Sequence, residues 1–193
     1  MPHQHIIRFW VDEIGEKGWY ERSDDTDEMI RARFLPHWEE AKPLTDDWCH
    51  SAEHMLAAVI LTDQFPRNMF REDGRAFATD ALAREIADKA IAQGFDLATP
   101  MPMRQFFYMP FMHSRSLADQ DRAVALCGEF LTEDSHRHAI LHRETIRVFG
   151  RFPWRNAMVG RETTPAEQAF LDLGGYGALV TGRLSLEALR EMV

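Results

Sequence analysis

Residues 46–64, DDWCHSAEHMLAAVILTDQ, carry the strongest helical pattern in the chain. Their apolar positions follow the 3.6-residue period of a helix with one buried face. That face consists of Trp48, Met55, Leu56, Val59 and Ile60. Proline disfavours helical geometry at the residue before it, so Pro66 is expected to end this helix.

The same period recurs along most of the sequence. It predicts helices over residues 4–15, 26–41, 75–93, 104–112, 116–131, 134–149 and 183–191, and one that begins at Thr164-Pro165. Asp134 or Ser135 is expected to cap the helix over 134–149, and Gly174–Gly177 is expected to form a turn. No stretch alternates apolar and polar residues as a strand does. We therefore expect an all-α fold of about eight helices, arranged as antiparallel pairs in a single domain over residues 1–193.

Composition narrows the class of protein. The 193 residues carry a net charge of −9, which argues against general binding to nucleic acid or to an anionic membrane surface. No apolar run approaches the ~18 residues of a membrane span, and the N-terminus does not resemble a signal peptide. We expect a cytoplasmic protein. Cys49 and Cys127 each lie in an apolar helical pattern and are expected to be small buried residues.

Positive charge is concentrated in one segment. Residues 136–161 contain six arginines and a single acid, Glu144. Four of these arginines, Arg143, Arg147, Arg151 and Arg155, recur every four residues. They form either a solvated face paired with acids elsewhere or a pocket in which guanidinium groups converge on an anion. The sequence leaves both interpretations open.

Two Phe-Pro corners carry polar residues. The first, Asp63-Gln-Phe-Pro-Arg-Asn68, has a partial echo at Arg151-Phe-Pro-Trp-Arg-Asn156. Such a corner is either the lip of a binding site, where arginine offers a fork to a carboxylate or phosphate, or an internal clamp at a helix end. Both roles are compatible with a position beside a cleft.

Histidines supply the remaining candidates. His138 and His142 lie four residues apart on one helical face, a spacing that can chelate a metal, but the Glu of a His-Glu-x-x-His motif is missing. We therefore expect neither a metal nor a cofactor. His113-Ser114 lacks a nucleophile elbow, so Ser114 is expected to cap the helix over 116–131 and His113 to line a cleft.

Four motifs, in order, resemble a known family. Asp63-Gln-Phe-Pro-Arg-Asn, Phe106-Phe-Tyr-Met-Pro-Phe-Met-His-Ser, Phe149-Gly-Arg-Phe-Pro-Trp-Arg-Asn and Gly160-Arg-Glu-Thr-Thr-Pro-Ala-Glu are similar to segments of the bacterial domain-of-unknown-function family 924. The resemblance implies a right-handed, tetratricopeptide-like superhelix of stacked helix pairs, and no assigned reaction. Trp154 stands where the family pattern implies His, and Arg115 where it implies Glu.

We expect the chain to bind a small anionic molecule or a peptide terminus in a polar cleft. The expected lining residues are Asp63, Gln64, Arg67, Asn68, Tyr108, His113, His138, His142, Arg151, Arg155 and Asn156. One alternative is a hydrolase or transferase with His142 or His113 as general base. A second alternative is a protein-interaction scaffold that binds a partner helix or peptide in its groove.

Overall fold

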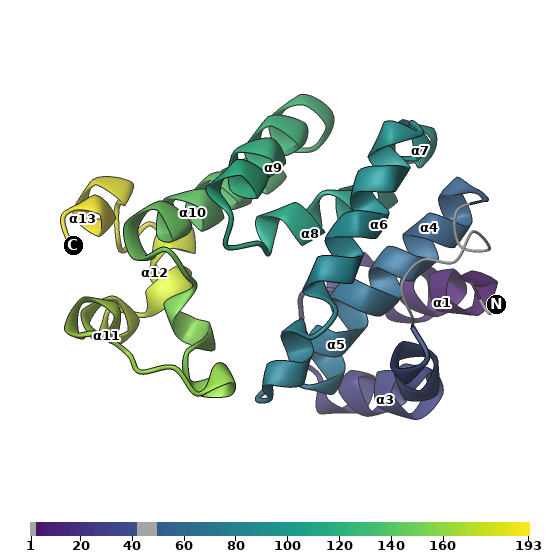
Figure 1. The fold of residues 1–193 in the computed structure, drawn as a ribbon, viewed down its shortest axis with the longest axis horizontal. Helices are drawn as coiled ribbons and strands as arrows, with labels where there is room; N and C mark the ends of the chain where they lie inside the picture. Colours follow the sequence, from purple (N-terminus) through teal and green to yellow (C-terminus); the bar gives the residue numbers. More distant parts are fainter. Residues whose placement is uncertain (1–2, 42–49) are drawn as a thin grey trace. The chain divides into compact units, whose positions relative to one another are not determined.

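The computed structural model describes residues 3–41 and 50–193, and within them it contains helices and no β-strand (Figure 1). The prediction of an all-α fold is confirmed. Residue contacts gather in two compact units, Met1–Pro110 and Phe111–Val193. The expected single domain and the superhelical arrangement stay predictions. No helix in the described ranges is both long enough and apolar enough to cross a membrane.

The first unit consists of short helices interrupted by tighter and wider turns. They are α1 (His3–Arg8), a π-helical turn (Phe9–Ile14), α2 (Gly15–Gly18), α3 (Asp24–Glu39), α4 (Ala52–Val59), a second π-helical turn (Ile60–Gln64), α5 (Phe65–Met69), a 3₁₀ turn (Gly74–Phe77), α6 (Asp80–Ala92), α7 (Phe95–Ala98), a 3₁₀ turn (Met103–Phe107) and α8 (Met109–Met112). α8 contains the boundary between the units. Trp48 and Cys49, part of the helix expected over 46–64, lie outside the described residues.

The second unit is built on two longer helices, α9 (Leu117–Phe130) and α10 (Glu133–Phe149), joined by two residues. Such a short connection makes the pair antiparallel. Beyond them lie two 3₁₀ turns (Pro153–Arg155 and Ala157–Val159), α11 (Pro165–Asp172), α12 (Gly175–Val180) and α13 (Leu186–Arg190). α12 starts inside the segment that was expected to be a turn, because Gly174 adopts a left-handed conformation and the helix begins directly after it.

Pro66 does not end the helical run, contrary to the expectation. The chain passes from α4 through the π-helical turn into α5, with Pro66 in the first turn of α5. Proline has no N–H, so the carbonyl of Thr62 lacks its usual helical donor. The hydroxyl of Thr79 donates to that carbonyl at 2.6 Å, and Arg67 donates to the next carbonyl, that of Asp63, at 2.5 Å. The Thr79 hydroxyl, from outside the helix, thus supplies the donor that Pro66 lacks, and the Arg67 side chain adds a donor from within α5.

Aromatic rings form the core of the first unit. The Phe65 ring lies 4.7 Å from the ring of Phe34 and 5.5 Å from that of Trp10, with Phe9 and Phe106 beside them. All five side chains are buried. Phe65 therefore packs at the centre of this core because α5 continues the helical run.

Helix caps in the second unit differ from the expectation by a few residues. Thr132, and not Asp134 or Ser135, caps α10, because its side chain accepts from the N–H of Ser135. Ser116 caps α9, while the Ser114 hydroxyl donates to Asp119 at 2.6 Å and accepts from the N–H of Ser116. Thr164 caps α11 as predicted, and Glu167 completes a capping box.

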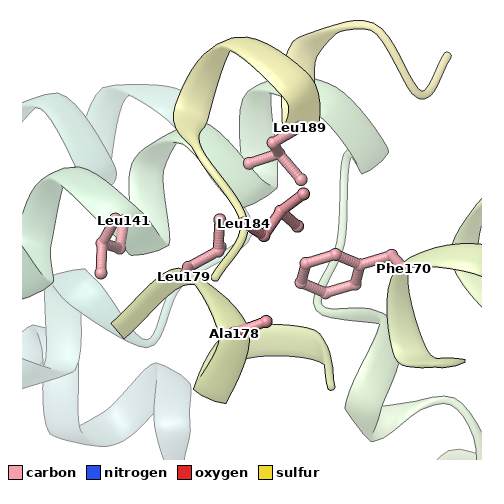
Figure 2. Close-up of a cluster of buried hydrophobic side chains, with 6 residues drawn as sticks. All are labelled: Leu141, Phe170, Ala178, Leu179, Leu184 and Leu189. Carbon is pink, nitrogen blue, oxygen red and sulfur yellow. The ribbon is translucent and has the colours of Figure 1, made fainter. Parts of the chain in front are cut away.

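The core that α10 shares with α11–α13 is formed mainly by leucines. Figure 2 shows the buried side chains of this cluster, which are Leu141 of α10, Phe170 of α11, Ala178 and Leu179 of α12, and the later leucines Leu184 and Leu189. Cys127 is buried as predicted, and desolvation raises the pKa of its thiol to about 12. This thiol therefore stays protonated and unreactive at neutral pH.

The Thr79 hydroxyl provides a test of the Pro66 junction. It donates to the Thr62 carbonyl and accepts from the indole nitrogen of Trp38. We expect Thr79→Val to lower the free energy of unfolding by roughly 1–3 kcal/mol, because a carbonyl in the core loses its donor. Urea unfolding measures this. Thr181→Val removes an exposed hydroxyl and should change stability by less than about 0.5 kcal/mol; equal effects of the two substitutions would contradict the account.

Candidate functional site

The corner at residues 63–68 is held by partners inside the first unit. Asp63 is fully buried and pairs with Arg67 at 3.3 Å, and Gln64 donates to the Asp63 carboxylate at 2.5 Å. Arg67 also pairs with Asp80 at 2.9 Å. Tyr108, buried as well, donates to Asp96 at 2.7 Å. These contacts favour the clamp interpretation over an open binding lip.

Asn68 belongs to a second clamp in the same unit. Its amide donates to Asp27 at 2.9 Å, and Arg71 binds the same carboxylate through Nε and Nη2. Asp27 lies in the first turn of α3, where a negative charge is also favoured by the helix dipole. The clamp therefore ties α5 to the start of α3. Asp27 and Arg71 were not among the predicted residues.

The corner at residues 151–156 repeats this arrangement with other residues. Arg151 forms two bonds to Glu167, at 2.5 and 2.7 Å, and Asn156 donates to the same carboxylate at 3.2 Å. Glu167 is 2% exposed and also accepts from the N–H of Thr164. The hydrogen bond from Arg151 is the main cause that lowers the pKa of Glu167 to about 2, against the opposing effect of burial. In each case an asparagine of the corner binds a buried carboxylate in the first turn of a helix together with an arginine, Arg71 for Asp27 and Arg151 for Glu167.

The arginine series on α10 also finds internal partners. Arg147 binds the fully buried Glu144 at 2.9 Å, Arg143 approaches it at 3.3 Å, and Arg190 of α13 binds it at 2.7 Å. Burial alone would raise the pKa of Glu144, but these arginines outweigh it and the pKa is lowered. Asp121 pairs with Arg143 as well. Arg143 and Arg147 thus follow the interpretation in which acids elsewhere pair with them.

A group of rings around His142 is the best candidate site. The His142 ring lies 4.6 Å from that of Tyr176, 5.6 Å from Phe152, 6.2 Å from Trp154 and 6.5 Å from His113. We call these five residues the histidine–aromatic cluster. Phe152 is buried, whereas the other four are partly exposed. Solvent therefore reaches a set of flat rings with two histidines among them.

The hydrogen bond of His142 fixes its tautomer. Nδ1 lies 2.9 Å from the carbonyl of His138, and a carbonyl only accepts, so Nδ1 carries the proton. In the neutral ring the lone pair then lies on Nε2. Desolvation is the main cause that lowers the pKa of His142 to about 3, and the positive charge of Arg155 adds to it. Nε2 is therefore a hydrogen-bond acceptor at neutral pH and a weak base.

His138 and Tyr176 form a short link at the edge of the cluster. The Tyr176 hydroxyl lies 2.5 Å from Nδ1 of His138, and Nε2 of His138 lies 3.7 Å from Asp134. Burial raises the pKa of Tyr176, so its hydroxyl keeps its proton in this hydrogen bond with His138. Tyr176 is a residue that the sequence did not single out, because it lies within the glycine-rich segment expected to be a turn.

Arg155 brings positive charge to the cluster. Its guanidinium lies 4.4 Å from the Phe152 ring centre and donates to the carbonyl of His113 at 3.2 Å. Arg155 is 8% exposed, and His113 is partly exposed. Of the predicted residues in the second unit, His113, His138, His142 and Arg155 thus come together, while Arg151 and Asn156 face Glu167. One cleft that includes residues of both units stays a prediction.

Hollows in the first unit are lined by charged side chains. One, of about 560 Å³, contains Asn68 and the Asp27–Arg71 clamp. Another, of about 400 Å³, is lined by His5, Arg8 and Arg33 of α1 and α3 and their neighbours. Within the described ranges, no three His, Cys, Asp or Glu side chains are grouped so that they could hold a metal ion.

Comparison with known proteins places the chain. A family model described as a bacterial protein of unknown function, DUF924, matches residues 6–175. The chain belongs to this family. It is also similar to a solved structure of a protein of unknown function, ATU0120, from Agrobacterium tumefaciens, with 38% identity and a TM-score of 0.82. The match covers 89% of this chain and 97% of that one. No curated protein matches the chain.

The Glu167 clamp of this DUF924 member gives a pH-dependent prediction. We expect Glu167→Gln to lower the free energy of unfolding by roughly 2–3 kcal/mol at pH 7, because Arg151 loses its buried counter-charge. The wild-type advantage is complete above the ordinary glutamate pKa, and it declines as the pH falls from about 4.5 toward 2. Urea unfolding between pH 7 and pH 3 measures both effects. Glu162→Gln removes an exposed charge nearby and is the matched control; a difference that grows on acidification would contradict the clamp.

A second prediction concerns the protonation of His142. In the folded DUF924 protein we expect its ring to stay neutral, with the proton on Nδ1, until the pH approaches about 3. The unfolded ring takes up a proton near pH 6.5, so this histidine should reduce stability as the pH falls below that value. Nitrogen-15 NMR of the histidine rings, in buffer and in urea, measures both states. A folded-state midpoint near 6.5 would refute the desolvation of this ring.

Proposed function

We propose that the second unit binds a small organic anion with a flat apolar body, and that the histidine–aromatic cluster is the binding site. The observation that carries the proposal is the group of partly exposed rings around His142 with the buried Arg155 beside it. Flat rings stack on flat ligands, and a buried positive charge attracts an anionic group. A peptide C-terminus that ends in an aromatic residue belongs to the same chemical class.

The groups around His142 offer a ligand different contacts, since an acceptor nitrogen binds a donor group of the ligand and a guanidinium binds its anionic group. Nε2 of His142 accepts a hydrogen bond at neutral pH, and the guanidinium of Arg155 contributes positive charge next to it. Trp154 and Tyr176 offer partly exposed faces, with ring centres 5.4 Å apart. Few polar groups among aromatic walls are typical of a small-molecule site.

The structure favours binding over acid–base catalysis. A general base works best when its pKa lies near the working pH, whereas the pKa of His142 is lowered to about 3. Ser114 donates its hydroxyl to Asp119, which occupies it in a cap. Arg67, Arg151 and Asn156 already bind carboxylates of the protein itself, so the ligand proposal depends on the histidine–aromatic cluster and on Arg155.

We also propose that the helix pairs stack as a tetratricopeptide-like superhelix. The short connection between α9 and α10 supports this architecture, because it makes these two helices an antiparallel pair.

Three probe anions test the proposal. We expect benzoate to bind more tightly than acetate or inorganic phosphate, because only benzoate combines an anionic group with a ring. Isothermal titration calorimetry gives the dissociation constants, and NMR of the histidine rings reports whether His142 and His113 respond. Equal affinity for benzoate and acetate would refute a role for the aromatic walls.

Paired variants locate the site. Arg155→Gln should weaken benzoate binding by roughly tenfold or more, because a charge-assisted contact is lost. Arg147→Gln removes the same charge from a side chain that serves Glu144 and should change affinity by less than about twofold. Trp154→Leu, at a partly exposed position, should also weaken benzoate binding, and circular dichroism checks that each variant is folded. Benzoate binding unchanged in both Arg155→Gln and Trp154→Leu would sink the proposal.

A further inference from the structure

Arg161 is held in an unusual environment in the second unit. Its Nε and Nη1 atoms are buried, and neither has a hydrogen-bond partner among the described residues. A guanidinium remains charged under all ordinary conditions and offers five N–H donors. Buried donors without an acceptor cost free energy, and in native structures they commonly mark an ion or a water that completes the site. Arg161 therefore calls for an acceptor from outside the chain.

The charges around Arg161 indicate what kind of acceptor fits. Arg115 and Arg151 lie close enough to lower its pKa, after burial, which is the largest cause. Glu167 is the acid that acts in the opposite direction. Three guanidinium groups against one carboxylate leave an excess of two positive charges. Like charges so placed repel one another, and an anion relieves that repulsion.

Glu167 does not neutralise this group further, because its oxygens are already engaged. Arg151 donates to both carboxylate oxygens of Glu167. Asn156 and the N–H of Thr164 donate to one of these oxygens, Oε2. Arg115 is exposed, and it forms neither a hydrogen bond nor an ion pair with any of the described residues. Positive charge at Arg115 and Arg161 is therefore not balanced locally.

The group is reachable from solvent. Arg115 is exposed, and Arg151 and Arg161 are partly exposed, so an ion can approach the buried donors along the exposed part of the side chains.

Asn156 lies beside Arg161. The backbone N–H of Arg161 donates to the backbone carbonyl of Asn156 at 2.9 Å, and the side-chain oxygen Oδ1 of Asn156 is buried without a partner among the described residues. The backbone thus fixes Arg161 next to the Glu167 clamp.

We propose that Arg161 and Arg115 form an oxyanion-binding site, specific for a phosphate or carboxylate group. Phosphate is the better fit, because its oxygens point in several directions and its charge approaches the local excess of two. The Nε and Nη1 donors lie on different edges of the planar guanidinium, which a group with three or four oxygens serves better than a carboxylate. This site is separate from the histidine–aromatic cluster and does not depend on the ligand proposed there.

Thermal unfolding with added ions tests the site. We expect 20 mM inorganic phosphate to raise the melting temperature of the wild-type protein above that in potassium chloride of equal ionic strength, because an ion that binds only the folded state stabilises it; about 20 mM is ample for a millimolar dissociation constant. Acetate at the same ionic strength should give a smaller increase. NMR of the Arg161 Nε–H group should shift with phosphate. No phosphate-specific shift of that signal would overturn the proposal, and an equal response to acetate and phosphate would overturn its preference for phosphate.

Charge reversal at the exposed position provides the sharpest variant. Arg115→Glu should raise the melting temperature in the absence of phosphate, because the new side chain brings a negative charge near Arg161. The same substitution should weaken phosphate binding by roughly tenfold or more. Arg183→Glu reverses the charge of another exposed arginine in the same unit and should leave phosphate binding within about twofold. Equal losses in both variants would reduce the effect to general electrostatics and overturn the site.

The two proposals fail independently. Arg155→Gln should remove benzoate binding at the histidine–aromatic cluster and leave the phosphate shift of Arg161 intact. Arg115→Glu should do the reverse. Loss of both responses in Arg155→Gln would show that the two sites are one, and it would overturn the separate oxyanion site.

Discussion

Buried carboxylates gripped by arginine are the interactions on which this protein's architecture depends. Asp27, Glu144 and Glu167 are each almost or fully buried, and each binds at least one guanidinium. An uncompensated buried charge is strongly destabilising, so each pair has to form as the chain folds. The pairs join segments distant in sequence: Glu144 of α10 pairs with Arg190 of α13, and Asp27 of α3 pairs with Arg71, which follows α5. Because both partners must meet, each pair constrains how the two segments that carry it pack against each other.

This constraint explains why the conspicuous polar motifs turn out to be largely structural. Asn68 and Asn156 are the last residues of the two Phe-Pro corners, and each donates to a carboxylate that an arginine also binds. The same geometry is built from an aspartate in one unit and a glutamate in the other. Arginine and asparagine residues that resemble a ligand site in the sequence here bind carboxylates in the first turns of the protein's own helices. What remains for a ligand is the charge that these clamps do not use.

The helical period predicted the fold class because it depends only on local spacing. The helix expected over 116–131 became α9 with a shift of one residue at each end, whereas the one expected over 75–93 became α6 only from Asp80, after a 3₁₀ turn. Pro66 was misjudged because the carbonyl that it leaves without a helical donor finds one at a distance in sequence, in the hydroxyl of Thr79. His138, His142 and Arg155 were identified from their residue types, and their neighbour Tyr176 was missed because it lies among glycines. The partners of Arg151 could not be predicted either, since Glu167 is 16 residues away and only folding brings it close.

The two π-helical turns have a consequence for how this chain can change in length. Each has more residues per turn than an α-helix. The first turn contains Phe9 and Trp10, and the second directly precedes Phe65. An insertion or deletion of one residue there would rotate everything downstream by about 100° around the helix axis. The aromatic rings would then point away from one another. A change of one residue in these two segments therefore disturbs the aromatic core, whereas one in a surface loop leaves that core in place.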